Sequence, residues 1–259
     1  MEKSKRISLI KRVVSTVVLA PVVLGAIVDG WNTLALLAVI ISALLSWEWA
    51  SMVPNKKNAV YTVAYLSASV CAIFYANVGY SLAIMGGTML FVWYKAKDEE
   101  HRRLLTCGVP YIVLGMGSLV WLYVLFGEVI TLWFVLAVWS VDIGGYVVGS
   151  TVKGPKLAPS ISPNKTWSGL LGGMLFAMLT SAATAYFFNR GAYAEFMVLG
   201  AVLAVVSQCG DLLESKVKRY LNVKDSSNLI PGHGGIFDRV DGLIFAAPFV
   251  LAIFLFFII

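Results

Sequence analysis

Long uncharged apolar runs, separated by short polar stretches, follow one another along the whole chain. A membrane-spanning helix needs about 20 apolar residues to cross about 30 Å of hydrocarbon. Runs that approach or exceed this length occur at residues 13–28, 30–47, 104–127, 166–189 and 242–259. These runs predict an all-α integral membrane protein.

Three further apolar stretches complete the predicted set of helices. Residues 59–94 are uncharged over the length of two crossings, and Asn77 and Gly79 favour a turn between them. Residues 129–150 and 196–213 are two more crossings, each interrupted by one aspartate. The chain is therefore predicted to be polytopic, with about nine transmembrane helices.

The positions of the basic residues orient these helices. With a cytoplasmic N-terminus, alternate loops place all but Arg190 of the 20 lysines and arginines on the cytoplasmic side. The positive-inside rule describes this asymmetry, so the N-terminus is predicted to be cytoplasmic. Residues 1–103 are expected to form about four N-terminal helices. Residues 104–259 are expected to form a catalytic half with cytoplasmic loops 150–166 and 214–240.

The composition excludes a soluble domain. Hydrophobic residues make up 59% of the chain and charged residues 13%, with a mean hydropathy of +0.82, whereas soluble domains have about 45–50% and 25%. The net charge of +6 is assigned to a cytoplasmic face near anionic headgroups, so nucleic acid is not an expected partner. The basic, apolar start is interpreted as an uncleaved first helix. Because no Arg/Ser-rich leader is seen, the inner (plasma) membrane of a bacterium is the expected location.

Two polar loops on the predicted cytoplasmic side carry the candidate chemistry. The second loop, 211–241, begins and ends with aspartates beside apolar helices, where charge costs about 2.5–3.5 kcal/mol on insertion scales. At its start, four side chains share one helical face through i, i+3, i+4 and i+7 spacing: Asp211, Glu214, Ser215 and Lys218. At its end, Asp238 and Asp241 are spaced i, i+3. Since Mg²⁺ prefers carboxylate oxygens, the three aspartates are candidate metal ligands. Ordinary ion pairs with neighbouring bases are the alternative.

A glycine-rich segment, Pro231-Gly-His-Gly-Gly235, lies between these acids. Glycines allow close approach of the backbone, and successive amide N–H groups can form a concave anion site. Four nearby bases add donors for phosphate: Lys218, Arg219, Lys224 and Arg239. His233 could donate to a phosphate or be an ordinary turn histidine. Together these residues predict a site for a metal and a polyphosphate.

The first polar loop, 142–168, is a smaller version of the second. Asp142 lies one or two turns inside an apolar helix, and Asn164 with Thr166 is expected to cap the next helix. Three lysines supply positive charge for a substrate, or contact anionic lipid as in an ordinary juxtamembrane loop: Lys153, Lys156 and Lys165.

Other residues receive plainer interpretations. Glu48, between Trp47 and Trp49, is interpreted as an interfacial residue rather than an acid that supports the site. The glycines of 144–145 and 169–173 permit close helix packing, within one chain or between two, so a homodimer is left open.

The second loop follows a longer pattern. It reads Ser215-x-Val217-Lys218-Arg219, then Lys224-Asp225-x-Ser227, then Ile230-Pro231-x-His233-Gly234-Gly235-Ile236-x-Asp238-Arg239-Val240-Asp241. This resembles the full signature of the phosphatidate cytidylyltransferases, also called CDP-diacylglycerol synthases. Asp142-x-x-x-Tyr146 and Ile161-Ser-Pro-x-Lys165-Thr-Trp167 resemble the upstream motif of that family. Where the family usually has Glu after Lys-Thr-Trp, this chain has Ser168, which receives no metal or catalytic role.

The resemblance implies transfer of CMP from CTP to phosphatidate, which gives CDP-diacylglycerol and pyrophosphate. It implies Mg²⁺ and a monovalent cation such as K⁺, with membrane lipids around the site. The implied metal ligands are Asp211 and Asp238, with Asp241 as a further ligand. The implied catalytic residues are Lys218, Arg219, Lys224, Asp225, His233 and Arg239. The implied substrate-binding residues are Asp142, Lys165, Ser215, Ser227, Gly234 and Gly235.

Two other kinds of function are weighed. A transporter would place polar residues near the middle of the bilayer and show internal symmetry, whereas these acids gather at one face and no repeat is visible. Related lipid enzymes are the second kind, namely a CTP-dependent lipid-alcohol kinase or a CDP-alcohol phosphotransferase. The last aspartates of a phosphotransferase are four apart, but Asp238 and Asp241 are three apart. Acyl-chain preference, CTP against dCTP, and which acid binds which metal are left open.

Overall fold

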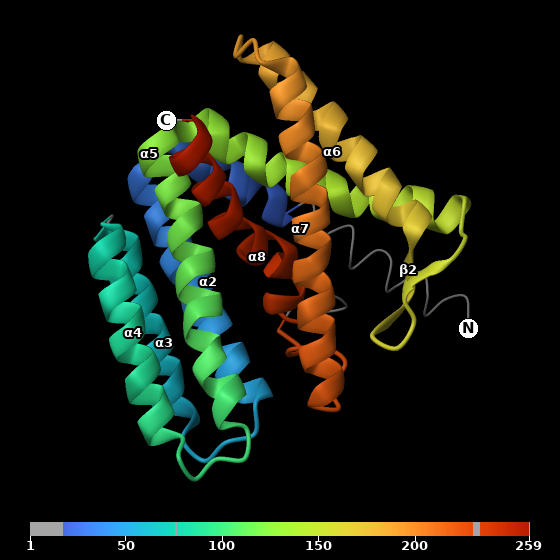
Figure 1. Ribbon diagram of the computed structural model, residues 1–259. Coiled ribbons are helices and arrows are strands. Elements are labelled where there is room, and N and C mark those ends of the chain that lie inside the picture. Colours follow the sequence, from blue (N-terminus) through green and yellow to red (C-terminus); the bar gives the residue numbers. More distant parts are fainter. Residues whose placement is uncertain (1–17, 76, 230–233, 259) are drawn as a thin grey trace. The chain divides into compact units, whose positions relative to one another are not determined.

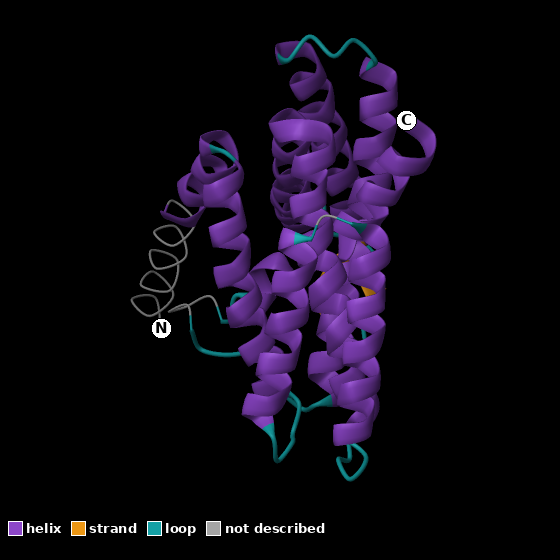
Figure 2. Ribbon diagram, turned by 90° about the vertical axis from the view of Figure 1, so that its left-hand side faces the viewer, coloured by secondary structure: helices purple, strands orange, loops and turns teal. Residues whose placement is uncertain are grey.

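The computed structural model describes residues 18–75, 77–229 and 234–258, which are almost entirely helical (Figure 1 and Figure 2). The helices are Val18–Asp29, α2 (Trp31–Met52), α3 (Asn58–Phe74), α4 (Val78–Lys95), α5 (Arg102–Thr151), α6 (Trp167–Phe187), α7 (Tyr193–Tyr220) and α8 (Phe237–Ile253). A short π-helical turn, Phe254–Ile258, follows α8. The predicted all-α fold is confirmed.

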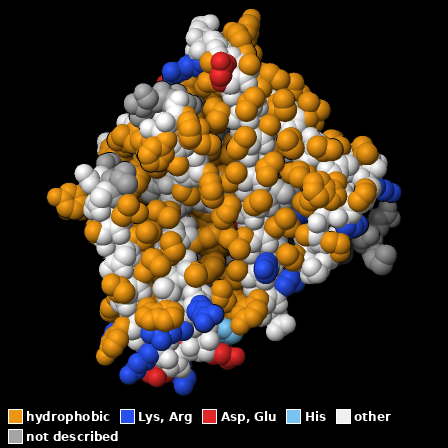
Figure 3. All heavy atoms as spheres, in the orientation of Figure 1, with side chains coloured by type: hydrophobic (Ala, Val, Ile, Leu, Met, Phe, Trp, Pro, Cys, Tyr) orange, Lys and Arg blue, Asp and Glu red, His pale blue; other side chains and the backbone are white. Residues whose placement is uncertain are grey.

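Several of these helices are built to lie in a membrane. Among the described residues, five helical stretches are long and apolar enough to cross one: α2, α5, α6, α7 and Phe237–Phe257. Large apolar side chains such as Val63, Leu90 and Leu171 are exposed rather than packed inside. On the face drawn in Figure 3, hydrophobic side chains cover much of the surface. A water-facing surface would not carry so many, so the chain is a membrane protein.

Helix α5 is two helices joined end to end at Gly127. With 50 residues, α5 is more than twice as long as one crossing requires. The backbone of Gly127 has a φ of 83°, which glycine adopts without the strain of a side chain. The predicted crossings 104–127 and 129–150 end and begin at this break.

Side-chain caps mark two of the predicted helix starts. Asn77, at the predicted turn, accepts the N–H of Tyr80 at 3.2 Å and so caps α4. Thr166 caps α6, because its Oγ1 accepts the N–H of Gly169 at 3.1 Å. Asn164, expected to share this cap, lies instead in a strand.

A small β-hairpin was not predicted. Strands β1 (Lys156–Ala158) and β2 (Ser162–Thr166) pair antiparallel, with Lys156 opposite Thr166. The hairpin carries the chain from the end of α5 to the start of α6. Proline interrupts a helix by removing an N–H donor, and Pro159 and Pro163 leave this segment to an extended conformation.

The chain packs as two compact units. The first comprises Met1–Glu128, as far as it is described, and Leu221–Val240; the second comprises Val129–Tyr220 and Asp241–Ile259. In the first unit, α2 packs on α3 and α3 on α4. Buried Tyr65 and Trp49 donate to the carbonyl oxygens of Leu105 and Leu104, at 2.7 and 3.1 Å. These bonds join α2 and α3 to the start of α5.

In the second unit, helices approach closely through glycine. A Cβ on Gly144 of α5 would lie 2.6 Å from the carbonyl oxygen of Gly172 in α6, and a Cβ on Gly173 would lie 2.9 Å from that of Val141. No other residue fits such contacts without movement of the helices. The close packing predicted for these glycines is therefore confirmed, and it occurs within one chain.

Candidate functional site

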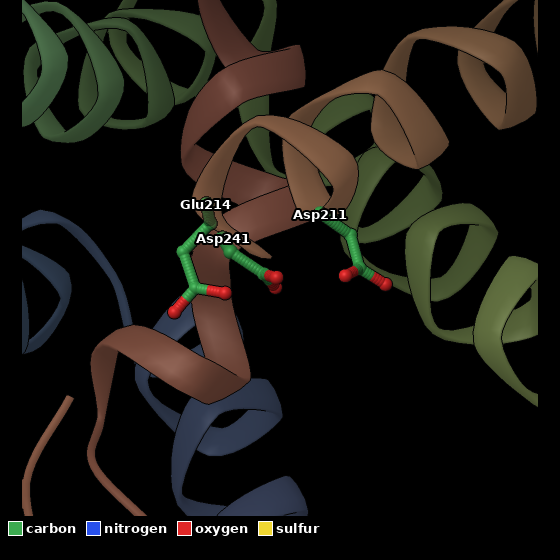
Figure 4. A group of neighbouring side chains, drawn as sticks. All are labelled: Asp211, Glu214 and Asp241. Carbon is green, nitrogen blue, oxygen red and sulfur yellow. The ribbon is translucent and has the colours of Figure 1, made fainter. Parts of the chain in front are cut away.

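Three carboxylates from two helices meet in the second unit, and we call them the acidic cluster (Figure 4). Asp211 and Glu214 lie one turn apart on α7, and Asp241 lies near the start of α8. One oxygen atom from each lies within 4.8 Å of the others. The helices can approach here because Gly210 has no side chain; a Cβ on it would lie 2.5 Å from the Cβ of Phe245.

Two bases stand beside the acidic cluster. Lys165 from β2 forms an ion pair with Asp211, and Lys218 forms one with Glu214 at 2.7 Å. Glu214 and Lys218 are only 3% and 8% exposed. Ser215, one turn from Asp211, donates to its carboxylate at 3.4 Å. These ion pairs form alongside the cluster. The alternative, in which the three aspartates pair with Lys218, Arg219 and Arg239, stays a prediction.

The donor set of the acidic cluster suits a hard divalent metal. Mg²⁺ binds one or two protein carboxylates and keeps waters and substrate phosphates as its other ligands. Three carboxylate oxygens within 4.8 Å of one another, from groups of which Asp211 is only half-buried, meet that requirement. The residues present therefore fit a magnesium ion.

A cavity of about 880 Å³ lies beside Asp211 in the same unit, within the range of about 300–1,000 Å³ typical of ligand sites. Its charged and amide lining residues are Asp142, Lys153, Lys156, Asn164, Lys165, Gln208 and Asp211. Its glycines are Gly145, Gly149, Gly154 and Gly169. Three lysines along a glycine-rich wall, next to a carboxylate cluster, can hold a phosphate-bearing ligand.

Asp238 takes part in a different network, in the first unit. Its carboxylate accepts the N–H of Gly235 at 2.7 Å and the N–H of Ser226 at 3.0 Å. It shares the one hydroxyl proton of Ser226 with the carboxylate of Glu48, since the Ser226 Oγ lies 3.1 Å from each. Asp238 thereby joins two parts of the segment that connects α7 to α8, at Ser226 and at Gly235. Its role as a metal ligand stays a prediction.

The two described glycines of the predicted phosphate site are shaped by their neighbours in the first unit. Gly234 has a φ of 80°, which favours glycine. A Cβ on Gly235 would collide with Ser226 and Glu48, and the Gly235 N–H is already bonded to Asp238. The need for glycine at 235 is thus explained by packing, and the contact of these glycines with a phosphate stays a prediction.

The interfacial interpretation of Glu48 is wrong. Its side chain is fully buried in the first unit, where it accepts hydrogen bonds from Ser226, Ser227, Ile236 and Phe237. These donors are about 180 positions away in the sequence, so no local pattern reveals them.

The remaining predicted site residues are spread over both units. Arg219 is exposed, and its Nε donates to the carbonyl oxygen of Ile161 at 3.5 Å. Lys224, Asp225 and Arg239 are exposed on the connection between α7 and α8 or at the start of α8. His233 lies outside the described residues.

Two residues of the site are not among the predicted site residues: Glu214, which shares the acidic face of α7, and Gln208. Gln208 lines the cavity one turn before Asp211, so the i, i+3 spacing that joins Asp211 to Glu214 also reaches back to this amide.

Comparison with known proteins identifies the family of the chain. The model of the cytidylyltransferase family matches residues 10–257. The chain belongs to this family. A phosphatidate cytidylyltransferase of Brucella suis biovar 1 (strain 1330) is 32% identical over 244 residues, which cover 91% of this chain and 89% of that protein. One of Rickettsia prowazekii (strain Madrid E) is 37% identical over 199 residues, 72% and 86% of the two chains. The expected family and activity, those of a phosphatidate cytidylyltransferase and hence a nucleotidyltransferase, are confirmed.

Proposed function

We propose that the chain transfers CMP from CTP to phosphatidate at the acidic cluster and the lysine-lined cavity beside it. A phosphate oxygen of phosphatidate attacks the α-phosphorus of CTP, the new P–O bond gives CDP-diacylglycerol, and pyrophosphate leaves. The observation that carries this assignment is the position of Asp211, which belongs to the cluster and also lines the cavity.

Magnesium is the proposed metal, held by Asp211, Glu214 and Asp241. When bound, it would neutralise phosphate charge and polarise the phosphoryl oxygens. A monovalent cation such as K⁺ is a further proposed cofactor, on the strength of the family resemblance. Whether Asp238 contributes to binding either ion is to be tested by substituting it.

The lysines of the cavity have a distinct task. Both substrates are anionic, so their approach requires positive charge more than covalent chemistry. Lys153, Lys156 and Lys165 line the cavity and can each contact phosphate oxygens. The attacking phosphate oxygen is already ionised at neutral pH, so the site needs no strong general base.

The proposed setting is the inner (plasma) membrane of a bacterium, with nine crossings, a cytoplasmic N-terminus and a cytoplasmic active site. The break of α5 at Gly127 supports two crossings there, and the shorter apolar helices Val18–Asp29 and Asn58–Phe74 support two more. CTP would then enter from the cytoplasm, while phosphatidate would arrive laterally with its acyl chains in the bilayer.

The test is a transfer assay with purified protein in detergent. Phosphatidate, radiolabelled CTP and Mg²⁺ are supplied, and label is followed into the lipid phase with and without EDTA. Lipid labelling that EDTA abolishes and Mg²⁺ restores is the expected result. Labelling that persists in EDTA would contradict the metal assignment, and a correctly folded protein that labels no lipid would contradict the activity.

A further inference from the structure

A buried carboxylate that the proposed reaction does not use lies on α2. Glu48 has two oxygen atoms, and each lies within hydrogen-bond distance of two donors; one donor, the Ser226 hydroxyl, is shared with Asp238. Oε1 accepts the hydroxyl of Ser227 at 2.6 Å and the N–H of Ile236 at 2.9 Å. Oε2 accepts the hydroxyl of Ser226 at 3.1 Å and the N–H of Phe237 at 2.7 Å.

Two of these four donors belong to the start of α8. The first N–H groups of any helix have no partner inside the helix, and they carry the positive end of its dipole. Ile236 directly precedes α8 and Phe237 is its first residue. A carboxylate bonded to both N–H groups therefore caps α8, although it comes from a helix that ends at residue 52.

Trp49, the residue next to Glu48, contacts the start of α8 through its ring. Trp49 packs on Phe237 with ring centroids 5.3 Å apart, and Tyr111 stacks on Phe237 at the same distance. The backbone and the side chain of Phe237 are thus both fixed, by adjacent residues of α2. The start of α8 has little freedom to move.

The charge of Glu48 is not needed merely to fill the space that its side chain occupies. A buried carboxylate is costly unless every acceptor is bonded, and an apolar side chain could fill the same volume. Only a carboxylate can accept from two hydroxyls and two N–H groups at once, since an amide such as Gln has one accepting oxygen. The carboxylate of Glu48 also lies so close to Gly235 that a Cβ at position 235 would collide with it.

We propose that Glu48 is a positioning residue for CMP transfer: it fixes the first turn of α8 and the Ser226–Ser227 segment, and that same helix carries Asp241, a proposed metal ligand, one turn further on. Asp241 lies four residues after Phe237, on the same face of α8. This inference rests on the proposed function, because it presumes that Asp241 binds the metal.

The test compares Glu48→Gln, Glu48→Asp and the control Ser46→Ala, which alters a buried residue of the same helix two positions away. Mn²⁺ binding to the substrate-free protein is measured by electron paramagnetic resonance, together with thermal unfolding and the Mg²⁺ dependence of kcat. Glu48→Gln should weaken Mn²⁺ binding about tenfold, as loss of a group that orients a metal ligand does, and should lower kcat about a hundredfold. Glu48→Asp should recover part of both, and Ser46→Ala should match the wild type.

A purely structural role predicts another pattern. The folded fraction of Glu48→Gln would then unfold at a lower temperature but bind Mn²⁺ and depend on Mg²⁺ as the wild type does, which would overturn the proposal. Asp241→Asn in the same assays separates the two ideas. If it too binds Mn²⁺ normally, the proposed metal site is wrong and the positioning role falls with it. If only Glu48→Gln binds normally, the metal site stands and the positioning role is wrong.

A second variant covers the case in which Glu48→Gln does not fold. Ser226→Ala with Ser227→Ala removes two of the four donors, of which the Ser226 hydroxyl also contacts Asp238, but leaves the two backbone bonds to the carboxylate of Glu48. It should weaken Mn²⁺ binding in the same direction and by less. Wild-type Mn²⁺ affinity in this double variant would overturn the proposal.

Discussion

The ammonium group of Lys165 pairs with the carboxylate of Asp211, and that carboxylate is at the same time part of the acidic cluster. A metal ion that binds the cluster must therefore share Asp211 with a lysine or displace it. The same lysine lines the cavity, where a phosphate group would offer it a new partner. Exchange of Lys165 from Asp211 to a substrate phosphate would couple metal binding to substrate binding.

Lys165→Met should therefore change metal binding and turnover in opposite directions. Loss of a competing ion pair worth about 1 kcal/mol should tighten Mn²⁺ binding about fivefold in the absence of substrate. Turnover should fall, because the cavity loses a charge that offsets the substrate phosphates. Mn²⁺ titration and the transfer assay check the two effects.

The control for this variant is Lys156→Met, which removes another lysine from the lining of the same cavity. It should leave Mn²⁺ binding unchanged. Unchanged or weaker binding in Lys165→Met would show that the ion pair does not compete with the metal.

A second prediction concerns the segment before α8. Gly235→Ala places a methyl group against Ser226 and the carboxylate of Glu48, and overpacking of this kind costs about 1–3 kcal/mol of stability. Thermal unfolding in detergent measures the loss. Gly86→Ala in α4 is the matched control, since a Cβ there meets nothing within 4 Å, and alanine should stabilise the helix by up to about 1 kcal/mol. Equal unfolding temperatures for the two variants would refute the crowded packing at Gly235.

The contact between α5 and α6 leads to a third prediction. Gly144→Ala would bring its methyl group within 2.6 Å of the carbonyl oxygen of Gly172 and 2.7 Å of the Phe176 ring. The helices must separate, which should destabilise the second unit by about 1–3 kcal/mol. Gly25→Ala, in open space on another helix, should not destabilise. Thermal unfolding measures the stability of both variants. An unchanged unfolding temperature for Gly144→Ala would mean that α5 and α6 pack less closely than described.

The fourth prediction concerns the orientation in the membrane. In a background with Cys71, Cys107 and Cys209 replaced by serine, a single cysteine is introduced as Gly191→Cys or as Lys156→Cys. A membrane-impermeant maleimide should label the first in intact cells and the second only after the cells are opened. The reverse pattern would contradict the cytoplasmic placement of the hairpin and the cavity.

Much of the fold could be predicted because its signals are local. The apolar runs correspond to the helices, Asn77 and Thr166 cap where short polar residues interrupt the runs, and Gly127 breaks α5 between two predicted crossings. The hairpin was missed because two short strands of polar residues and proline carry no alternating apolar pattern.

The site could be predicted only in part, because its contacts join distant segments. Spacing shows that Asp238 and Asp241 share a face of one helix, but it does not show which neighbours each one meets. Asp241 meets Asp211 and Glu214, whereas Asp238 bonds to Ser226 and Gly235. The burial of Glu48 depends on donors almost the whole length of the chain away, and local sequence does not report such contacts.

Mn²⁺ binding to purified Asp241→Asn tests whether the acidic cluster holds the metal for CMP transfer. Asp98→Asn, in an exposed loop, is the control. The wild type and Asp98→Asn should bind Mn²⁺ alike, whereas Asp241→Asn should bind it at least about tenfold more weakly and transfer no label to lipid while remaining folded. Wild-type Mn²⁺ affinity and lipid labelling in Asp241→Asn would show that the cluster does not hold the metal.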